Sequence, residues 1–166
     1  MTGDAVDDIL EQWASERPEL AAGALGVVLR VMSLSRSFAR EAARALAPVG
    51  LEVHEYDALA ALRRQGEPFE LAATALAAET GLSSGAMTNR IDRLEQRGLV
   101  RRRADPADRR GVNVSLTAAG QRVIDEAIRL RLAAAEASLG GLSGDEQRRL
   151  ADLLRKLVLR AAGGDD

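Results

Sequence analysis

Apolar residues recur every three or four positions along most of this chain, which is the spacing of one face of an α-helix. The longest such run extends from about Pro18 or Ala21 to Leu46, and Pro48 and Gly50 close it. The whole pattern predicts seven helices, at residues 4–16, 18–46 or 21–46, 54–64, 70–79, 83–97, 117–139 and 143–161.

A different pattern lies between the fifth and the sixth of these helices. Residues 112–116 alternate apolar and polar side chains, as a half-buried strand does, and residues 99–103 are a second candidate strand. The Pro-, Asp- and Gly-rich segment 105–111 between them predicts a turn. Two short helices followed by a hairpin is the order of a winged helix-turn-helix domain. The predicted fold class is therefore mainly α with a small β-hairpin wing.

Signals at the helix ends support these boundaries. Ser83 and Thr117 each stand just before a helical run and are predicted N-caps. Ser143 is followed three positions later by Glu146, which is the pattern of a capping box. Gly98 follows the fifth helix directly and is predicted to end it.

The helices that flank the winged domain have apolar stripes too long for so small a core to bury. A symmetric homodimer is the commonest way to bury such stripes, so we expect the flanking helices to form a dimer interface. The expected organisation is an extra N-terminal helix at 1–19, a dimerisation helix at 20–50, a winged helix-turn-helix DNA-binding domain at 51–118, C-terminal dimerisation helices at 119–162 and a disordered tail at 163–166.

Composition excludes several kinds of site. The 166-residue chain has no cysteine, which excludes disulfides, zinc–thiolate sites and thiol redox sensing. His54 is the single histidine, which excludes a multi-histidine metal site, and we expect the His54-Glu55 pair to open a helix on the surface. Because the sequence has no phosphate-binding glycine loop and no nucleophile paired with a base, we predict no enzyme and no cofactor.

The N-terminus is acidic and lacks the basic lead and apolar core of a signal peptide. No apolar run approaches the roughly 20 residues that a membrane-spanning helix needs. We therefore expect a cytoplasmic protein with no membrane partner.

Charge is distributed unevenly, although the formal net charge is only −2. Residues 1–20 hold six acidic residues against Arg17, whereas residues 83–110 hold eight arginines against four acidic residues. A local positive excess within an acidic protein is typical of a phosphate-binding surface, and a solvated helix face is the alternative. The arginines of this basic segment are Arg90, Arg93, Arg97, Arg101, Arg102, Arg103, Arg109 and Arg110.

The fifth predicted helix has the properties of a helix that reads DNA. If Met87, Ile91 and Leu94 face the core, the polar residues of its first two turns face outward. Hydroxyl and amide groups there can bond to base edges, and Arg93 and Arg97 extend the positive face toward the DNA backbone. Arginines at the hairpin tip suit an adjacent minor groove. The predicted DNA contacts are Ser83, Ser84, Thr88, Asn89, Arg93, Arg109 and Arg110.

Residues 82–120, LSSGAMTNRIDRLEQRGLVRRRADPADRRGVNVSLTAAG, resemble the MarR (multiple antibiotic resistance regulator) family. The resemblance covers roughly residues 20–160 and includes the wing pattern D-x-R-x-x-x-V-x-L-T. It implies a triangular homodimer whose terminal helices interdigitate, with two recognition helices on a pseudo-palindromic operator and wing arginines in the minor groove. The residues that match the wing pattern are Asp108, Arg110, Val114, Leu116 and Thr117.

The extra N-terminal helix with its tryptophan resembles the urate-responsive branch of that family, which includes PecS, HucR and TamR. This resemblance implies an effector site made of Trp13, Asp57, Arg90 and Arg102. An indole can stack on a planar ring, an arginine can pair with an anion, and an aspartate can orient that arginine. Alternatively, Trp13 anchors a short helix by packing, and Asp57 and Arg90 form a structural ion pair.

These observations predict a homodimeric transcriptional regulator that binds double-stranded DNA. We expect a repressor that a small planar anionic ligand, such as urate or an aromatic acid, releases from its operator. Because Arg90 is next to Asn89, a ligand that draws Arg90 toward itself would move the DNA-reading helix. The alternatives are an activator of the same fold and a helical interaction module that does not bind DNA.

Overall fold

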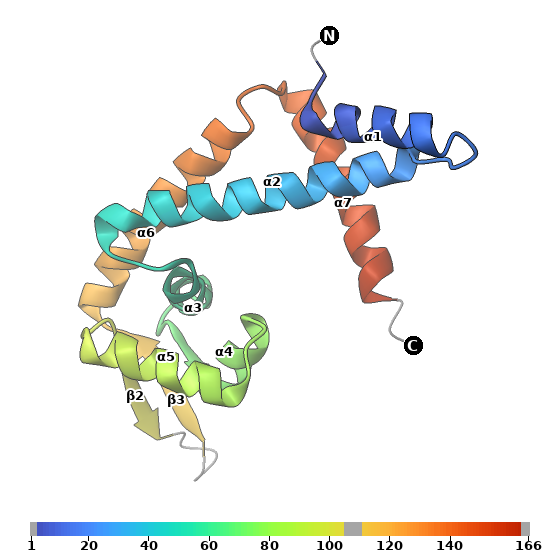
Figure 1. The fold of residues 1–166 in the computed structure, drawn as a ribbon. Helices are drawn as coiled ribbons and strands as arrows, with labels where there is room; N and C mark the ends of the chain where they lie inside the picture. Colours follow the sequence, from blue (N-terminus) through green and yellow to red (C-terminus); the bar gives the residue numbers. More distant parts are fainter. Residues whose placement is uncertain (1–2, 105–110, 164–166) are drawn as a thin grey trace.

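The computed structural model describes residues 3–104 and 111–163, and its longest helix, α2, crosses the molecule. Figure 1 shows a group of short helices and strands below one end of α2, with α1 packed at the other end. α6 leads away from the strands and crosses α2, which it contacts, and α7 then turns back toward the short elements. The helices of this frame are α1 (Ala5–Glu16), α2 (Gly23–Leu46), the 3-10 turn η1 (Ala47–Val49), α6 (Ala118–Ser138) and α7 (Gly144–Ala162).

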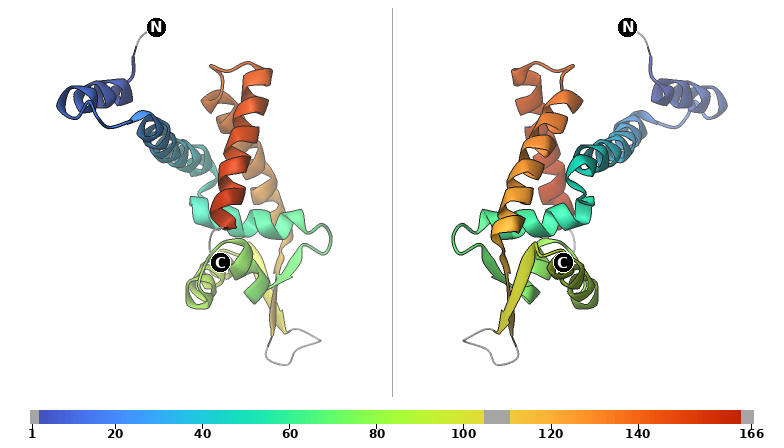
Figure 2. Two further views of the ribbon diagram at one scale, coloured as in Figure 1. Left: turned by 90° about the vertical axis from the view of Figure 1, so that its right-hand side faces the viewer. Right: turned by 90° about the vertical axis from the view of Figure 1, so that its left-hand side faces the viewer.

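The group of short elements is a winged helix-turn-helix domain, as predicted. Two helices in succession are followed by a hairpin that extends from the end of the molecule (Figure 2). The strands form one antiparallel sheet in the order β1–β3–β2, in which Arg102 of β2 faces Val114 of β3. The elements of the domain are α3 (Val53–Arg64), β1 (Glu70–Ala72), α4 (Ala73–Glu79), α5 (Ser84–Gln96), β2 (Val100–Ala104) and β3 (Val112–Leu116).

The prediction of one helix over residues 70–79 is wrong at its start. Residues 70–72 form β1, which pairs with β3 in the register Leu71 to Val114, and the helix begins at Ala73. The sequence ELAATALAAE favours a helix along its whole length by propensity, but backbone hydrogen bonds to β3 override that preference. The sheet therefore has three strands where the sequence predicted a two-stranded hairpin.

The predicted helix caps are confirmed. The side chains of Ser83 and Thr117 accept hydrogen bonds from backbone N–H groups in the first turns of α5 and α6. Ser143 and Glu146 form the predicted capping box at the start of α7. Gly98 follows α5 with a positive φ of 68°, the left-handed conformation in which glycine commonly ends a helix.

One hydrophobic core lies within the winged domain and at the adjoining ends of α2 and α6. Almost all of its side chains are aliphatic. Small and medium residues therefore fill this core, with few aromatic rings. The largest fully buried side chains are Leu46, Leu59, Leu62, Leu76, Met87, Ile91, Leu94, Val100, Val114, Ser115 and Ile124.

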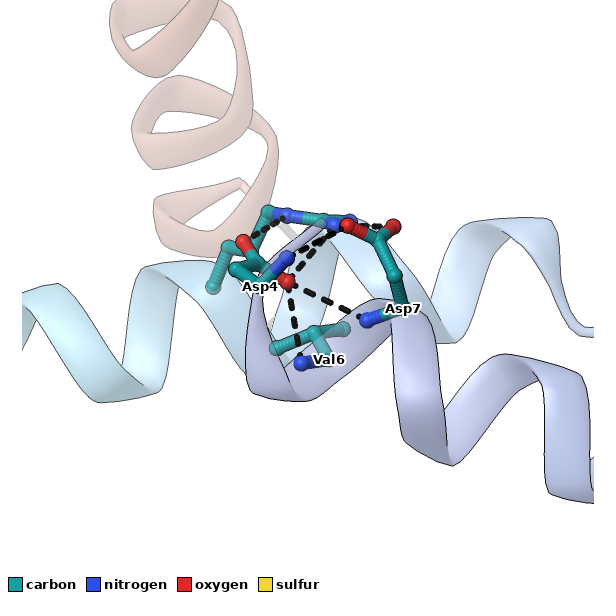
Figure 3. A network of polar contacts seen from close by, with 4 residues as sticks. Asp4, Val6 and Asp7 are labelled. Carbon is teal, nitrogen blue, oxygen red and sulfur yellow. Dashed lines mark hydrogen bonds and ion pairs between the residues drawn. The ribbon is translucent and has the colours of Figure 1, made fainter. Parts of the chain in front are cut away.

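α1 is fastened to α2 by a group of charged residues (Figure 3). Asp4 caps α1 and forms a capping box with Asp7, and the Arg30 guanidinium of α2 donates to both carboxylates at 2.6–2.9 Å. These hydrogen bonds from Arg30 lower the pKa of Asp4 below its ordinary value. Beside this cluster, Leu10 lies so close to Gly26 that a side chain at position 26 would meet it at 2.8 Å.

Two long helices leave apolar side chains uncovered in the single chain. In α7, whose residues 144–162 are all described, no residue is buried, although leucines follow one side of the helix. A groove of about 690 Å³ lies between α2 and α7 and is lined by Val31, Leu34, Phe38 and Leu154 among others. Within the described part of the chain, none of the helices is both long and apolar enough to cross a membrane. The exposed apolar residues of the two helices are Leu25, Val27, Val28, Val31, Met32, Leu34, Phe38, Leu150, Leu153, Leu154, Leu157, Val158 and Leu159.

At Gly120 the start of α6 packs closely against the backbone of Leu99, which directly precedes β2. This contact predicts that one added methyl group at position 120 has a large effect on stability. A Cβ at position 120 would lie 1.9 Å from the backbone oxygen of Leu99, and a backbone atom cannot move aside as a flexible side chain can. We expect Gly120→Ala to lower the free energy of unfolding by about 2–3 kcal/mol or more, as overpacking does. Urea denaturation followed by circular dichroism measures this change. Gly23→Ala is the control, because nothing lies within 4 Å of its added Cβ, and equal stability of the two variants would contradict the prediction.

Candidate nucleic-acid interface

α5 presents one apolar face to the core and one polar face to solvent. Met87, Ile91 and Leu94 are all buried, as predicted, because they recur at the spacing of a helix face. The predicted contacts on the other side are all exposed. These exposed residues are Ser83, Ser84, Thr88, Asn89 and Arg93.

The exposed polar groups of α5 differ in how far the fold already uses them. Ser83 accepts from the Ala86 N–H at 3.4 Å, and the Thr88 hydroxyl donates to the Ser84 carbonyl oxygen at 2.9 Å. Asn89 has no side-chain hydrogen bond to any residue that the structure describes. No described residue therefore occupies the two donors or the acceptor of its amide, which can bond to a base edge, whereas Ser83 and Thr88 each contribute to the helix itself.

The arginines of the basic segment divide into two groups. Arg93 is exposed and forms no ion pair with a described carboxylate, so its charge is open to solvent. Arg97 was expected to extend the same positive face, and this expectation is wrong. Its guanidinium turns toward the protein and pairs with Glu55 of α3 at 2.8 Å.

Glu55 is buried, with 7% of its surface exposed, although the sequence placed it at the surface. Burial alone would raise the pKa of this carboxyl group, but hydrogen bonds from the Glu52 backbone N–H and from Arg97 outweigh burial and lower the pKa below its ordinary value. Glu55 is thus a paired carboxylate inside the fold, next to the recognition helix.

Arg102 fastens the other flank of α5 to the wing. From β2 its guanidinium pairs with Asp92 at 2.6 Å and Glu95 at 2.8 Å, and its Nη2 donates to the Thr88 carbonyl oxygen at 3.2 Å. Its backbone N–H also donates to Glu95 at 2.9 Å. The acidic residues of α5 thereby neutralise Arg102, and these ion pairs lie on the flank of α5 that faces β2.

A small hollow of about 250 Å³ lies on the opposite flank of α5, against the start of α3. Arg90 and Arg93 of α5 line it together with His54 and Glu55 of α3. The Nε atom of Arg90 is buried and has no hydrogen-bond partner among the described residues. Arg90 and Arg102 therefore lie on different sides of the recognition helix.

Comparison with known proteins identifies the family. A family model described as MarR family matches residues 49–111. The HTH-type transcriptional regulator PecS of Dickeya dadantii (strain 3937) is 31% identical over 152 residues, which cover 92% of this chain and 92% of PecS. The chain belongs to the MarR family. The length of the match to PecS also supports the PecS-like branch that the N-terminal helix suggested.

Solved structures of other MarR-family members have the same fold. AbsC from Streptomyces coelicolor matches with a TM-score of 0.78 and 23% identity, over 87% of this chain and 97% of AbsC. A mutant of MarR from E. coli complexed with operator DNA matches with a TM-score of 0.70 and 24% identity, over 87% of this chain and 96% of that one. The predicted fold class, mainly α with a winged helix-turn-helix, is confirmed by these likenesses.

The tip of the MarR-family wing lies outside the described residues. Both tip arginines predicted to contact DNA, Arg109 and Arg110, belong to this segment. Asp108 of the wing pattern also lies outside the described residues. The structure places the other three residues of the pattern, because Val114 and Leu116 are buried and Thr117 caps α6. The Thr117 hydroxyl also donates to the Gly98 carbonyl oxygen at 2.7 Å, so it ties the wing to the turn after α5.

The four residues of the predicted effector site are not gathered at one place in the single chain. Trp13 is 46% exposed on α1, which lies at the end of α2 away from α5 and β2 (Figures 1 and 2). Asp57 is exposed on α3. Arg90 lines the hollow beside α3, whereas Arg102 pairs with α5 from the wing. Among the described residues, no ion pair joins Asp57 to Arg90.

The lowered pKa of Glu55 predicts an acid-sensitive contribution to stability. Because folding favours the charged form, this contribution is fully present above the unfolded pKa of a glutamate, about 4.3, and is lost as the pH falls through the lower folded-state pKa. We expect the loss of unfolding free energy in Glu55→Gln to be largest near pH 7 and to shrink toward pH 3. Urea denaturation at both pH values measures it. Glu11→Gln, on the exposed helix α1, is the control, and a loss in Glu55→Gln that is independent of pH would refute the prediction.

Proposed function

We propose that this MarR-family protein is a homodimeric repressor that binds a pseudo-palindromic operator through α5 and the wing. The observation that supports it best is the face of α5, where Asn89 and Arg93 project from a helix whose other face is anchored in the core. A helix of this kind can lie in the major groove, with the amide at base edges and the guanidinium at a phosphate. The relatives named above are transcriptional regulators, which agrees with the prediction that the chain is not an enzyme.

The uncovered apolar faces of α2 and α7 support the dimer. Each buried leucine or valine side chain contributes about 1.5–3 kcal/mol relative to an exposed one, so leaving these rows in water is unfavourable. A second copy can cover both rows at once, because a two-fold axis at the α2–α7 groove brings the same helices together. Such a dimer carries two copies of α5, as an operator with two half-sites requires.

A DNA titration tests the proposal and separates its parts. We expect the protein, at a mass of twice 17.7 kDa, to bind DNA from the intergenic region upstream of its own gene at least about 10³-fold more tightly than unrelated DNA. Asn89→Ala should weaken binding to the operator by about 1–3 kcal/mol and relax sequence preference, while Arg93→Ala should weaken binding to all DNA and reduce the salt slope by about one.

Fluorescence anisotropy at several salt concentrations gives these quantities. Arg129→Ala is the matched control, because it removes an exposed arginine of α6, outside α5 and outside the uncovered apolar faces of α2 and α7. If the wild-type protein binds no DNA specifically at low salt, the repressor proposal fails and the helical interaction module is favoured. Binding that raises transcription from the neighbouring promoter would instead make the protein an activator of the same fold.

We further propose that a planar anion, such as urate or an aromatic acid, acts through Trp13, Asp57, Arg90 and Arg102. In the single chain Arg102 is neutralised by Asp92 and Glu95, so an anion must compete with these carboxylates. An anion that displaces these carboxylates from Arg102 would weaken the ion pairs that join β2 to α5. The recognition helix would then shift away from its DNA-bound position. α1 lies at the end of α2 opposite its own winged domain, so Trp13 would approach this site from the second copy of the dimer.

Trp13 is the single tryptophan, which makes its fluorescence a specific reporter. We expect urate or an aromatic acid to change this fluorescence saturably and to release wild-type protein from operator DNA. In Arg102→Ala the same ligand should bind at least about tenfold more weakly, because a charge-assisted hydrogen bond is lost. Arg101→Ala, the neighbouring arginine on β2, is the control. Release that is unchanged in Arg102→Ala would remove Arg102 from the effector site without touching the DNA-binding proposal.

A further inference from the structure

The C-terminal end of the recognition helix is tied to the body of the protein by one guanidinium group. Arg97 follows α5 directly as its C-cap residue. Its Nη1 donates to both carboxylate oxygens of Glu55, at 2.9 and 2.8 Å, and its Nη2 donates to the Gly50 carbonyl oxygen at 2.9 Å. A planar guanidinium that holds partners on two nitrogens fixes direction as well as distance.

The two partners of Arg97 belong to the junction between α2 and α3. Gly50 comes directly after η1, the turn that ends α2, and it has a φ of 64° that favours glycine. Glu55 lies in the first turn of α3 and accepts the Glu52 backbone N–H at 3.0 Å as part of a capping box. The Arg97 side chain therefore joins three elements: the end of α5, the end of the long helix α2 and the start of α3.

Most other contacts of α5 are made within the winged domain. Its backbone packs chiefly on α4 and β2, and Arg102 binds it from the wing. These contacts orient α5 relative to its own domain. The Arg97 bridge differs, because it orients α5 relative to α2, the helix that provides the uncovered apolar face.

We propose that Arg97 and Glu55 are positioning residues that set the angle of the recognition helix against α2, and hence the spacing of the two recognition helices in the dimer. This inference rests on the proposed function. Two half-sites are read together when the recognition helices are about one DNA turn apart, roughly 34–36 Å. A small rotation of α5 about its own end changes that separation, so the bridge determines which half-site spacing the dimer accepts.

Glu55→Gln tests this role without removing a cation from the DNA-binding surface. The amide keeps the shape of the side chain but loses the charge. Its NH₂ group replaces one of the two oxygens that accept from Arg97, so two donors then face each other. Asp125→Asn is the matched control. Asp125 of α6 pairs at 2.7 Å with Arg63, which is on α3 like Glu55, so this ion pair joins α3 to α6 and does not involve α5. Arg97→Gln and Arg97→Lys complete the set, the second retaining charge without the planar fork.

Each variant is titrated with the operator that the wild-type protein binds in the upstream intergenic DNA, here called the selected operator. It is also titrated with operators whose half-sites are moved apart or together by one base pair. Thermal melting and molar mass are recorded for all variants, so that a loss of folding or of the dimer is visible. We expect wild type and Asp125→Asn to prefer the selected spacing equally. Glu55→Gln and Arg97→Gln should lose at least about tenfold of that preference while keeping their affinity for unrelated DNA. Arg97→Lys, the mildest change at the bridge, should fall between them and wild type.

Three results would overturn the inference. The first is an unchanged spacing preference in a folded, dimeric Glu55→Gln or Arg97→Lys. The second is a combination of two observations. Arg97→Gln loses affinity equally for all DNA and has a reduced salt slope, while Glu55→Gln binds DNA as tightly as wild type or more tightly. That combination would make Arg97 a phosphate contact. The third is an equal loss of spacing preference in Asp125→Asn, which would make the effect one of general stability. A wild-type protein with no specific DNA binding would instead overturn the proposed function on which the inference rests.

Discussion

The burial of three side chains on one face of α5 is the constraint on which the DNA-binding surface depends. Met87, Ile91 and Leu94 are fixed in the aliphatic core, and this fixes the rotation of the helix about its own axis. Asn89 then points away from the core, because it lies two positions from both Met87 and Ile91, and Arg93, one turn later, is exposed as well. The polar chemistry of the surface is thus set by apolar packing behind it.

Arginine has two different tasks in this protein, and a count of charges does not separate them. Arg97 and Arg102 hold α5 from its two flanks, one to the α2–α3 junction and one to the wing. Arg93 is exposed and has no carboxylate partner in the described part of the chain. The positive excess of the basic segment is therefore smaller in effect than its eight arginines suggest, since the carboxylates of Glu55, Asp92 and Glu95 neutralise two of them.

Most elements could be predicted from the sequence because their signals are local. Helix period, caps such as Ser83 and Thr117, and Gly98 after α5 depend on neighbours within a few positions. β1 could not be predicted, because residues 70–72 become a strand only by pairing with β3, more than forty positions later. The role of Arg97 was hidden for the same reason, since its partner Glu55 is 42 positions away. The effector residues stay a prediction that depends on a second copy of the chain.

The fastening of α1 has a consequence for the order in which the chain folds during synthesis. α1 spans 12 residues, none of them buried, and a helix of that length is marginal in water by itself. Its two anchors, Gly26 and Arg30, lie in α2 and leave the ribosome after it. α1 is thus made before α2 but cannot become stable before it, because α2 forms the surface that holds α1.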